Sequence, residues 1–596
     1  MVELPTWLFK VALPSQSIFG SNSADLLSSV KKSPVAILGL QGDDTINSQN
    51  ATDYVYAGLG KDVIRLNSSK DSANLARGGE GADTIFYGDS SGLITQDGES
   101  KCSLQGDKGD DSIRYEGSAT NIVVDAAFGG GQGADTLYLS GPQFVNSTIT
   151  GGMNNDSIRI AAASFTTSEV NGAMGADTIS YTAVSGALGS IYGGVGNDTI
   201  SLRGSVGKVM GGLGKDTITS GPFAATDAIQ SVNGISILGG GSDDSIALTS
   251  FTGTVRGDGS ADTANDGKDV ITLSAFGGGE VYGDGLADKI TITAPSASAT
   301  VGGGLGGDTI SITDIPTTGT KDAEGNANQN LVVNGGYGLD SIAIDLVKVG
   351  GVVETTTDVS VTINGGEGND TITTHIKNAT IFGGDNDDRI SLAAINGGFI
   401  DGGNGADAII ADSYNNTTTL KGGAGNDTFT FSGQKKLNTS NASIVAVDGG
   451  AGADTFALNT TITPITGKEI SEGKANLFVT KGSGDKIFLN EDLNGGFDFN
   501  AIKNLVVVNS STLIKAEVDK MGDDTLAAYQ SGDNTFYYLK NVVAGEDKSI
   551  GFAINAKMYD NSNFKFVDGV VNDATLASVG LTATVTENSG ITFGII

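Results

Sequence analysis

The chain has 596 residues, of which 90 are glycine and only one is tryptophan, and its formal net charge at pH 7 is −34. This acidity argues against nucleic acid as a partner, because phosphates repel a negative surface, and it favours solvation or bound cations. The single cysteine, Cys102, and the single histidine, His375, exclude a disulfide framework, a cysteine-based zinc cluster and two-histidine metal catalysis. We expect both to occupy ordinary structural positions. No apolar stretch approaches the roughly 18 residues of a membrane-spanning helix.

Residues 1–35 lack the repeat that fills most of the chain. Within them, residues 24–32 carry Leu26, Leu27 and Val30 and predict a helical turn or two before Pro34. The first apolar residues are interrupted by Lys10, so they do not form a cleaved signal peptide. Two interpretations of residues 1–35 remain open: a cap over the end of the core, or a segment that docks on a neighbouring molecule.

Residues 36–489 repeat one unit, whose clearest copy is residues 193–202. Its first six residues place glycines around a turn that ends at Asp198, and its last four alternate polar and apolar side chains. Glycine permits positive φ and a tight turn with inward-facing carbonyls, and the alternation is typical of a strand that shows one face to a core. Successive turn aspartates, such as Asp177, Asp198 and Asp216, lie 18 to 21 residues apart in the regular part of the repeat. A second short strand precedes most turns, as at residues 190–192.

A period near 20 residues that contains two strands indicates a solenoid in which stacked coils share one core. We therefore expect an all-β fold, a right-handed parallel β-roll or β-solenoid of about 20 coils, with the aspartate turns in a row along one edge. Longer connections, such as residues 314–330, should lie on the opposite edge. A turn rich in carbonyls that ends in aspartate suits a hard cation such as Ca²⁺. A row of carboxylates would otherwise repel itself.

The repeat stops after Ile487. Residues 490–596 carry denser apolar runs, such as residues 505–508, 535–539 and 549–554, bounded by Asn, Gly and Asp. These runs predict a separate C-terminal all-β segment.

The unit resembles the nonapeptide Gly-Gly-x-Gly-x-Asp-x-apolar-x of the repeats-in-toxin (RTX) calcium β-roll family. The strict six-residue opening occurs, for example, at residues 78–83, 193–198 and 365–370. The resemblance implies that turn carbonyls and carboxylates of adjacent coils share Ca²⁺ ions. The implied ligands are Asp62, Asp83, Asp111, Asp135, Asp177, Asp198, Asp216, Asp308, Asp340, Asp370, Asp388, Asp407, Asp427 and Asp454. The turns that end at Asp156 and Asp244 lack the glycine at the fourth position, and we expect them to bind weakly.

One feature departs from the family. The usual β-roll has glycine turns on both edges, whereas this chain has one such turn per coil, so we expect one calcium edge and one variable edge. The resemblance also implies that calcium binding is coupled to folding outside the cell. It further implies export by type I secretion, with an uncleaved signal within residues 540–596 and no cleaved N-terminal signal.

No enzyme is expected, because RTX proteases need a His-Glu-x-x-His motif and lipases need a catalytic histidine. A chain that is nearly all scaffold is similar to calcium-binding S-layer proteins and to oscillin-type surface fibril proteins. We therefore expect a secreted structural protein that binds its own copies, and cell-surface polysaccharide as a further partner. A secreted RTX adhesin and a polysaccharide lyase- or epimerase-like solenoid remain as alternatives.

Overall fold

A computed structural model gives the structure of the chain, which divides into two units, Met1–Thr293 and Ala294–Ile596, that we describe separately. In the first unit and at the start of the second it describes residues 16–29, 35–49, 53–66, 75–88, 102–117, 122–185, 189–204, 206–221, 232–259 and 266–315. In the rest of the second unit it describes residues 329–346, 348–349, 352–353, 359–376, 379–393, 395–396, 398–411, 414–415, 418–431, 445–458, 477–480, 486–489, 504–508, 525–531, 534–540, 542–543, 546–547, 550–555, 581–586 and 590–595.

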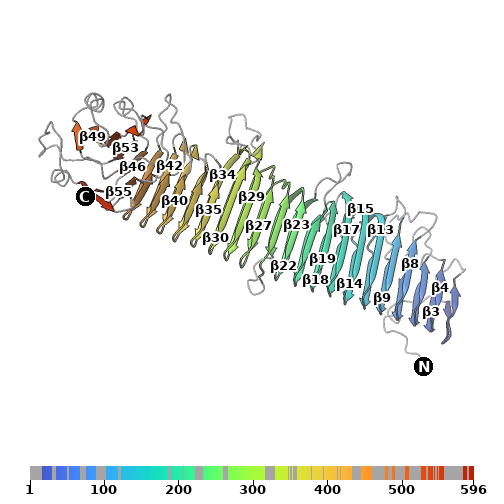
Figure 1. Ribbon diagram of the computed structural model, residues 1–596. Coiled ribbons are helices and arrows are strands. Elements are labelled where there is room, and N and C mark those ends of the chain that lie inside the picture. The colour runs from blue at the N-terminus through green and yellow to red at the C-terminus, as the bar shows by residue number, and fades with distance from the viewer. Residues whose placement is uncertain are drawn as a thin grey trace. The chain divides into compact units, whose positions relative to one another are not determined.

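The first unit is a stack of coils, each with one strand in each of two parallel sheets (Figure 1). Sheet A holds the strands that run into the glycine turn: β1 (Ser17–Phe19), β3 (Ala36–Gln41), β5 (Tyr54–Leu59), β7 (Leu75–Glu80), β9 (Ser103–Lys108), β12 (Ala127–Gln132), β14 (Thr148–Met153), β16 (Glu169–Met174), β18 (Ser190–Val195), β20 (Val206–Leu213), β22 (Val232–Gly241), β24 (Phe251–Asp258) and β26 (Gly279–Asp284).

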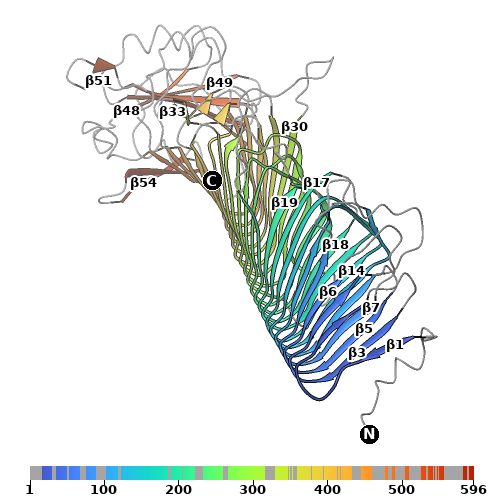
Figure 2. The same cartoon turned by 90° about the vertical axis from the view of Figure 1, so that its right-hand side faces the viewer.

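Sheet B holds the strands that leave the turn. They are β2 (Leu26–Ser28), β4 (Thr45–Ser48), β6 (Val63–Leu66), β8 (Thr84–Gly88), β10 (Ser112–Glu116), β13 (Thr136–Val145), β15 (Ser157–Thr166), β17 (Thr178–Ser185), β19 (Thr199–Gly204), β21 (Thr217–Ser220), β23 (Ser245–Thr249), β25 (Val270–Ser274) and β27 (Lys289–Thr293). The short β11 (Ile122–Val124) also pairs with β13. In Figure 2 the turns of this unit, coloured blue to green, line up along one edge of the stack.

The core follows from the alternation along each strand. In β19, Ile200 and Leu202 are buried while Thr199 and Ser201 face outward. Register places Ile200 directly on Ile179 of β17 and Ile218 of β21, so the same apolar position forms a continuous buried ladder. Burying each such side chain contributes about 1.5–3 kcal/mol. The predicted all-β parallel solenoid is therefore confirmed, and the described residues contain no helix long and apolar enough to cross a membrane.

The N-terminal prediction of a helical turn is wrong where the structure describes it. Residues Leu26–Ser28 form β2, which pairs in parallel with β4, and β1 pairs with β3. Stacked coils thus begin at Ser17 rather than near residue 36. The physical reason is that Leu27 occupies the buried position stacked on Ile46, so tertiary pairing overrides the local helical spacing.

The second unit repeats the same two-sheet coil. Its sheet A strands are β28 (Ala299–Leu305), β30 (Gln329–Tyr337), β34 (Val359–Glu367), β36 (Thr380–Asp385), β39 (Phe399–Asn404), β42 (Thr418–Ala424), β44 (Val445–Ala451) and β46 (Leu477–Thr480). Its sheet B strands are β29 (Thr309–Ile315), β31 (Ser341–Leu346), β35 (Thr371–Thr374), β37 (Arg389–Leu392), β40 (Ala408–Ala411), β43 (Thr428–Phe431), β45 (Thr455–Leu458) and β47 (Lys486–Leu489).

Two small pairings lie beside these coils. A hairpin joins β32 (Lys348–Val349) to β33 (Val352–Val353), and β38 (Ile395–Asn396) pairs with β41 (Tyr414–Asn415). The predicted insertion at residues 314–330 falls mostly outside the described residues.

The C-terminal segment is all-β, but it is not separate from the solenoid. It holds β48 (Asn504–Val508), β49 (Thr525–Ser531), β50 (Asn534–Lys540), β51 (Val542–Val543), β52 (Glu546–Asp547), β53 (Ile550–Asn555), β54 (Leu581–Thr586) and β55 (Gly590–Ile595). Strand β53 pairs with β46 of sheet A, and β55 pairs antiparallel with β47 of sheet B. The segment therefore adds strands to the last coil of both sheets.

Each glycine turn is a six-residue bend, here called the Gly-Asp bend, with left-handed backbone at its second and fourth positions. In the bend of residues 193–198, Gly194 and Gly196 have φ values of 119° and 136°. Where another residue replaces glycine the conformation persists, as at Ala173, whose φ is 81°. A Cβ on Gly194 would collide with the carbonyl of Ala173 in the coil before it. Close stacking of the bends is thus the reason for glycine at this position.

Ala173 and Gly194 are stacked partners at the second position of neighbouring bends, and they give a matched pair of substitutions. Ala173→Gly should raise the free energy of unfolding by about 1 kcal/mol, because it relieves a left-handed alanine. Gly194→Ala should lower it by more than about 2 kcal/mol, because strain and the carbonyl collision add. Urea unfolding in excess calcium measures both values, and equal effects of the two substitutions would contradict this account of the bend.

Candidate metal-binding bends

Asp198 shows how each bend is held to its neighbours. Its side chain is only 1% exposed, and its Oδ1 accepts a hydrogen bond of 2.7 Å from the backbone N–H of Asp177 in the preceding coil. Its own N–H donates to Oδ1 of Asp216 in the next coil, also at 2.7 Å. Because one oxygen of each carboxylate caps the backbone of the previous bend, the aspartates form a continuous ladder.

The ladder repeats in both units with donor–acceptor distances of 2.7 to 2.9 Å. The structure places all the predicted ligands at this one position of the bend, each at most 2% exposed. They are Asp62, Asp83, Asp111, Asp135, Asp177, Asp198 and Asp216 in the first unit, and Asp308, Asp340, Asp370, Asp388, Asp407, Asp427 and Asp454 in the second. The alignment of the aspartates along one edge, expected from their spacing, is thus present within each unit.

The second carboxylate oxygen has a different environment. Oδ2 is buried and has no hydrogen-bond partner in Asp62, Asp83, Asp111, Asp135, Asp177, Asp198 and Asp216, and likewise in Asp340, Asp370, Asp388, Asp407 and Asp427. A buried carboxylate oxygen without a donor is strongly unfavourable, because the charge has lost its water and gained nothing in return. Such an oxygen, repeated in consecutive described coils, calls for a proton or a cation.

The glycine at the first position of the bend makes room beside this oxygen. At Gly193 an added Cβ would collide both with Oδ2 of Asp198 and with the backbone carbonyl oxygen of Gly211 in the next coil. Two acceptor oxygens from adjacent coils therefore approach the same small space. The bend that ends at Asp62 is an exception, because Ala57 takes the first position and its Cβ fills the space that glycine leaves open.

Burial raises the pKa of these carboxyls well above their usual range. The pKa rises to about 7 in Asp83, about 8 in Asp111 and about 9 in Asp244, chiefly through burial. The N–H of the preceding bend lowers each pKa and the neighbouring carboxylates raise it, but burial is the largest cause. At neutral pH Asp83 therefore lies close to the balance between protonated and ionised forms, and Asp111 and Asp244 are mainly protonated.

The donor set fits calcium on chemical grounds. It consists of carboxylate and carbonyl oxygens, which hard cations prefer, and it contains no sulfur or imidazole. Among the described residues, no three Asp, Glu, His or Cys side chains come together as a metal-binding cluster. A cation at the bends would therefore depend on backbone carbonyls as well as on aspartates.

The structure adds bends that the predicted ligand set lacks. Asp44, Asp156, Asp244 and Asp269 are as buried as the others and have the same donor-free Oδ2. The bends of Asp156 and Asp244, expected to bind weakly, thus keep the same geometry despite Asn154 and Ser242 at the fourth position. Asp25, half-buried, begins the ladder, because its N–H donates to Asp44. In the sequence, Asp25 could have been found from its 19-residue spacing to Asp44 and from the apolar Leu27 two positions after it. Asp485, which stands two residues before Ile487 as the other turn aspartates stand before their apolar residues, lies outside the described residues.

The two isolated reactive residues lie elsewhere. Cys102 is buried, and burial raises the pKa of its thiol to about 12, so the thiol is protonated and inert. His375 contacts the carboxylate of Asp345 through Nδ1.

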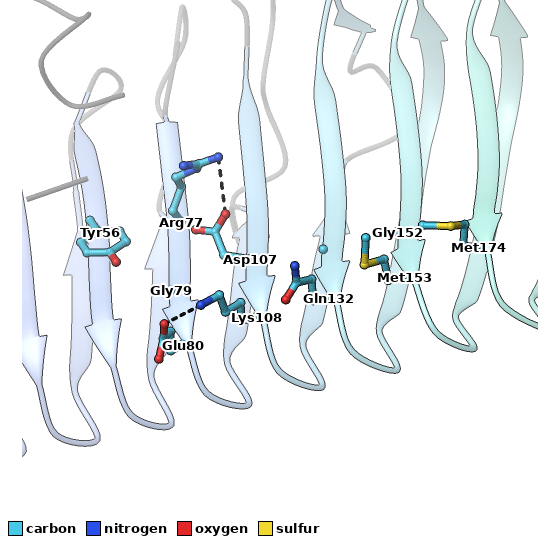
Figure 3. A pocket seen from close by; sticks show the side chains of 11 residues that line it. Tyr56, Arg77, Gly79, Glu80, Asp107, Lys108, Gln132, Gly152, Met153 and Met174 are labelled. Carbon is cyan, nitrogen blue, oxygen red and sulfur yellow. Dashed lines mark hydrogen bonds and ion pairs between the residues drawn. The ribbon is translucent and has the colours of Figure 1, made fainter. Parts of the chain in front are cut away.

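A shallow groove of about 660 Å³ crosses the outer face of sheet A in the first unit, near the bends (Figure 3). Its charged side chains pair with one another: Arg77 lies 3.4 Å from Asp107, and Lys108 lies 2.7 Å from Glu80. Tyr56 and Met153 supply apolar surface on either side. The groove therefore presents neutralised pairs and carries no arrangement of acid and base that would favour catalysis.

Comparison with known proteins gives no family assignment. No protein family model matches the chain, and no curated protein matches its sequence.

The raised pKa values predict how the metal-free protein responds to pH. In these aspartates the folded-state pKa lies above the unfolded value near 3.8, so the folded state binds more protons and stability falls as pH rises. After calcium has been removed, the protein should lose stability, and with it β-structure, as pH rises from the unfolded value of 3.8 to about 9, the highest of these raised pKa values. Circular dichroism with and without millimolar calcium measures this loss, and calcium should abolish it. A metal-free protein that gains structure as pH rises over this range would contradict the prediction.

Proposed function

We propose that this chain is a secreted, calcium-dependent structural protein that folds when Ca²⁺ occupies its Gly-Asp bends and then assembles with its own copies into a cell-surface layer or filament. The observation that supports calcium most directly is the row of buried Oδ2 atoms that have no donor and face backbone carbonyls.

Magnitudes favour a bound cation. Burying one unpaired ionised carboxylate costs several kcal/mol, whereas a whole domain is stable by only about 5–15 kcal/mol. A run of such groups in consecutive coils would therefore exceed the stability of the fold. Protons relieve this cost below the raised pKa values, and cations relieve it above them. Near neutral pH, calcium is the oxygen-preferring ion whose flexible coordination suits irregular turns better than the strict octahedron of magnesium.

The resemblance to the RTX repeat supports the same assignment and adds the secretory route. A chain whose fold depends on calcium stays loose where calcium is scarce and folds where calcium is plentiful, which suits export before folding. The acidic composition agrees, since one ion in each gap between bends would offset a charge of the order of the formal −34.

Self-assembly is supported by the edges of the sheets. At the N-terminal end, β1 and β2 each have one pairing partner among the described residues, namely β3 and β4. The side chains of Phe19 and Leu26 are 60% and 73% exposed there. Open strand edges that carry apolar side chains favour pairing with another chain, and a head-to-tail contact that does not close generates a filament.

The calcium assignment is tested by removing charge from the ladder while keeping its hydrogen bonds. The variant Asp177→Asn, Asp198→Asn, Asp216→Asn keeps the oxygen that caps the previous bend but loses three buried charges. It should raise the calcium concentration at the folding midpoint by roughly threefold or more, because cation ligands are lost. In chelator the same variant should be more stable than the natural chain. Calcium titrations followed by circular dichroism give both values.

A matched control removes three charges from exposed positions outside the bends: Glu169→Gln, Glu280→Gln, Asp314→Asn. The control should leave the calcium midpoint unchanged. If the ladder variant is more stable than the natural chain in calcium as well as in chelator, the aspartates only cap backbone groups and the calcium proposal fails.

Assembly is tested by electron microscopy and sedimentation of the purified full chain. Filaments or sheets should form in millimolar calcium and disperse in chelator. Phe19→Lys with Leu26→Lys should reduce assembly without moving the calcium midpoint of folding, because Lys on an edge strand opposes pairing. Folded monomers in millimolar calcium at high protein concentration would contradict the assembly proposal and leave the calcium proposal standing.

A further inference from the structure

The outer face of sheet B carries an alternation of arginine and aromatic side chains over five consecutive strands of the first unit. The third residue of each strand from β6 to β15 faces outward: Arg65, Phe86, Arg114, Tyr138 and Arg159. Register places each directly beside the next. Figure 1 shows β8, β13 and β15 within this stack. We call these five residues the arginine–aromatic column.

The side chains of the column contact one another as cation and ring. The guanidinium of Arg65 lies 5.8 Å from the ring centroid of Phe86. The guanidinium groups of Arg114 and Arg159 lie 5.2 and 5.3 Å from the ring centroid of Tyr138, which therefore has a cation on each side. The three arginines and Phe86 are exposed, and Tyr138 is half-buried. The column is thus ordered by its own contacts and still open to solvent.

The side chains around the column are short, and nearly all of them are uncharged. The first outward position of the same strands holds Val63, Thr84, Ser112, Thr136 and Ser157. The next outward position beyond the column includes Gly88, Ser140 and Ala161, and one acid, Glu116, which pairs with Arg114. Among the described outward residues of these strands, three arginines therefore stand against one carboxylate. This local positive charge lies on a chain whose formal net charge is −34.

We propose that the arginine–aromatic column binds an extended anionic polysaccharide that lies along the stack, across the strands. Stacked strands are about 4.8 Å apart, so the arginines, in every second coil, recur about every 10 Å. One disaccharide of an extended pyranose chain is about as long as two coils. In a polymer with one uronic acid per disaccharide, the carboxylates recur at the same interval as the guanidinium groups.

The chemistry of each position suits this ligand. A guanidinium binds a carboxylate with two parallel hydrogen bonds. Between the arginines, the exposed ring of Phe86 and the part of the Tyr138 ring that the two guanidinium groups leave uncovered offer apolar surface to a sugar ring. The hydroxyls of Thr84, Ser112 and Thr136 lie alongside and can exchange hydrogen bonds with sugar hydroxyls. Charge and apolar ring surface thus alternate in the protein as acid and neutral sugar alternate in the polymer.

Single-stranded nucleic acid also combines anions with stacking groups, but it fits less well. It carries a phosphate on each nucleotide, so its charges recur more often than the arginines do.

The column lies on the outer face of sheet B, whereas the Oδ2 atoms of the bends are buried, so this inference goes beyond the proposed structural function and needs only the folded solenoid. All binding measurements are therefore made on the folded full chain in calcium, with circular dichroism as a check. A chain that needs no calcium would overturn the calcium proposal and leave this one open to the same measurements.

The probe is hyaluronan, which has one carboxylate per disaccharide, with neutral dextran and poly(dT) as comparison polymers. The charge variant is Arg65→Gln, Arg114→Gln, Arg159→Gln, and the ring variant is Phe86→Ala, Tyr138→Ala. A matched control, Arg203→Gln, Lys208→Gln, Arg389→Gln, removes three cations from exposed or partly exposed positions outside the column. Isothermal titration calorimetry measures the affinity for each polymer.

We expect hyaluronan to bind and dextran not to bind. The charge variant and the ring variant should each lower the affinity for hyaluronan by about tenfold or more, and the control should change it less than about twofold. Added salt should weaken binding. Retained affinity in the charge variant, an equal loss in the control, or tighter binding of poly(dT) than of hyaluronan would each overturn the proposal.

Discussion

The structure depends on one electrostatic constraint: a carboxylate is buried in each described bend from Asp44 to Asp454, and in most of these bends the protein satisfies only one of its two oxygens. One oxygen accepts the backbone N–H of the previous bend, as Asp198 does from Asp177, and this bond fixes the register of the stack. The other oxygen of Asp198 lies beside the carbonyl of Gly211 in the next coil and has no hydrogen-bond donor. The ladder that orders the coils is therefore also a source of repulsion when its carboxylates are ionised, and in our proposal a cation at the same edge offsets this repulsion. Folding and cation binding are then one equilibrium.

Glycine makes this arrangement possible at three positions of the bend, for two reasons. At the first position it leaves space beside the carboxylate, and at the second and fourth it supplies left-handed backbone where the carbonyl of the previous coil comes close. The substituted bends show how the two requirements differ. Positive φ values near 80° persist in Ala173, Asn154 and Asn386. The backbone strain at these residues is offset by the packing of the surrounding stack. Ala57 instead fills the space beside Asp62. A substitution at the second or fourth position therefore adds strain but keeps the space for a cation, whereas a substitution at the first position removes that space.

Much of this was predictable from the sequence because the repeat is periodic at two levels. The spacing of the aspartates predicted the length of one coil, and the apolar residue two positions after each aspartate predicted the buried face of sheet B. The packing of Ile200 beside Ile179 confirms the second prediction. The same spacing aligned the candidate ligands. The sequence could not show that one carboxylate oxygen accepts a hydrogen bond from a backbone N–H, because that bond joins residues of neighbouring coils about 20 positions apart. It also misplaced the ends: Leu27 looks helical beside Leu26 and Val30 until the stacking on Ile46 is known. The pairing of β55 with β47 joins residues about a hundred positions apart in sequence and has no local signal.

The division between inward and outward positions decides where further function can lie on such a molecule. The inward residues of each coil are constrained by stacking. An apolar side chain packs on the apolar side chain of the next coil, as Ile179 does on Ile200, and the carboxylate of each aspartate accepts a hydrogen bond from the neighbouring bend. The outward residues of the same strands are free of that constraint, and most of them are threonine or serine, as in β19 and β21. An outward position that departs from this background in consecutive coils is therefore informative, since the fold does not require it. Arg65, Phe86, Arg114, Tyr138 and Arg159 are such a departure, and their alternation persists through five coils of irregular length. Because the coils are stacked at a regular spacing, residues that alternate from coil to coil also alternate at regular distances along the surface. That geometry suits a partner that is itself a regular polymer.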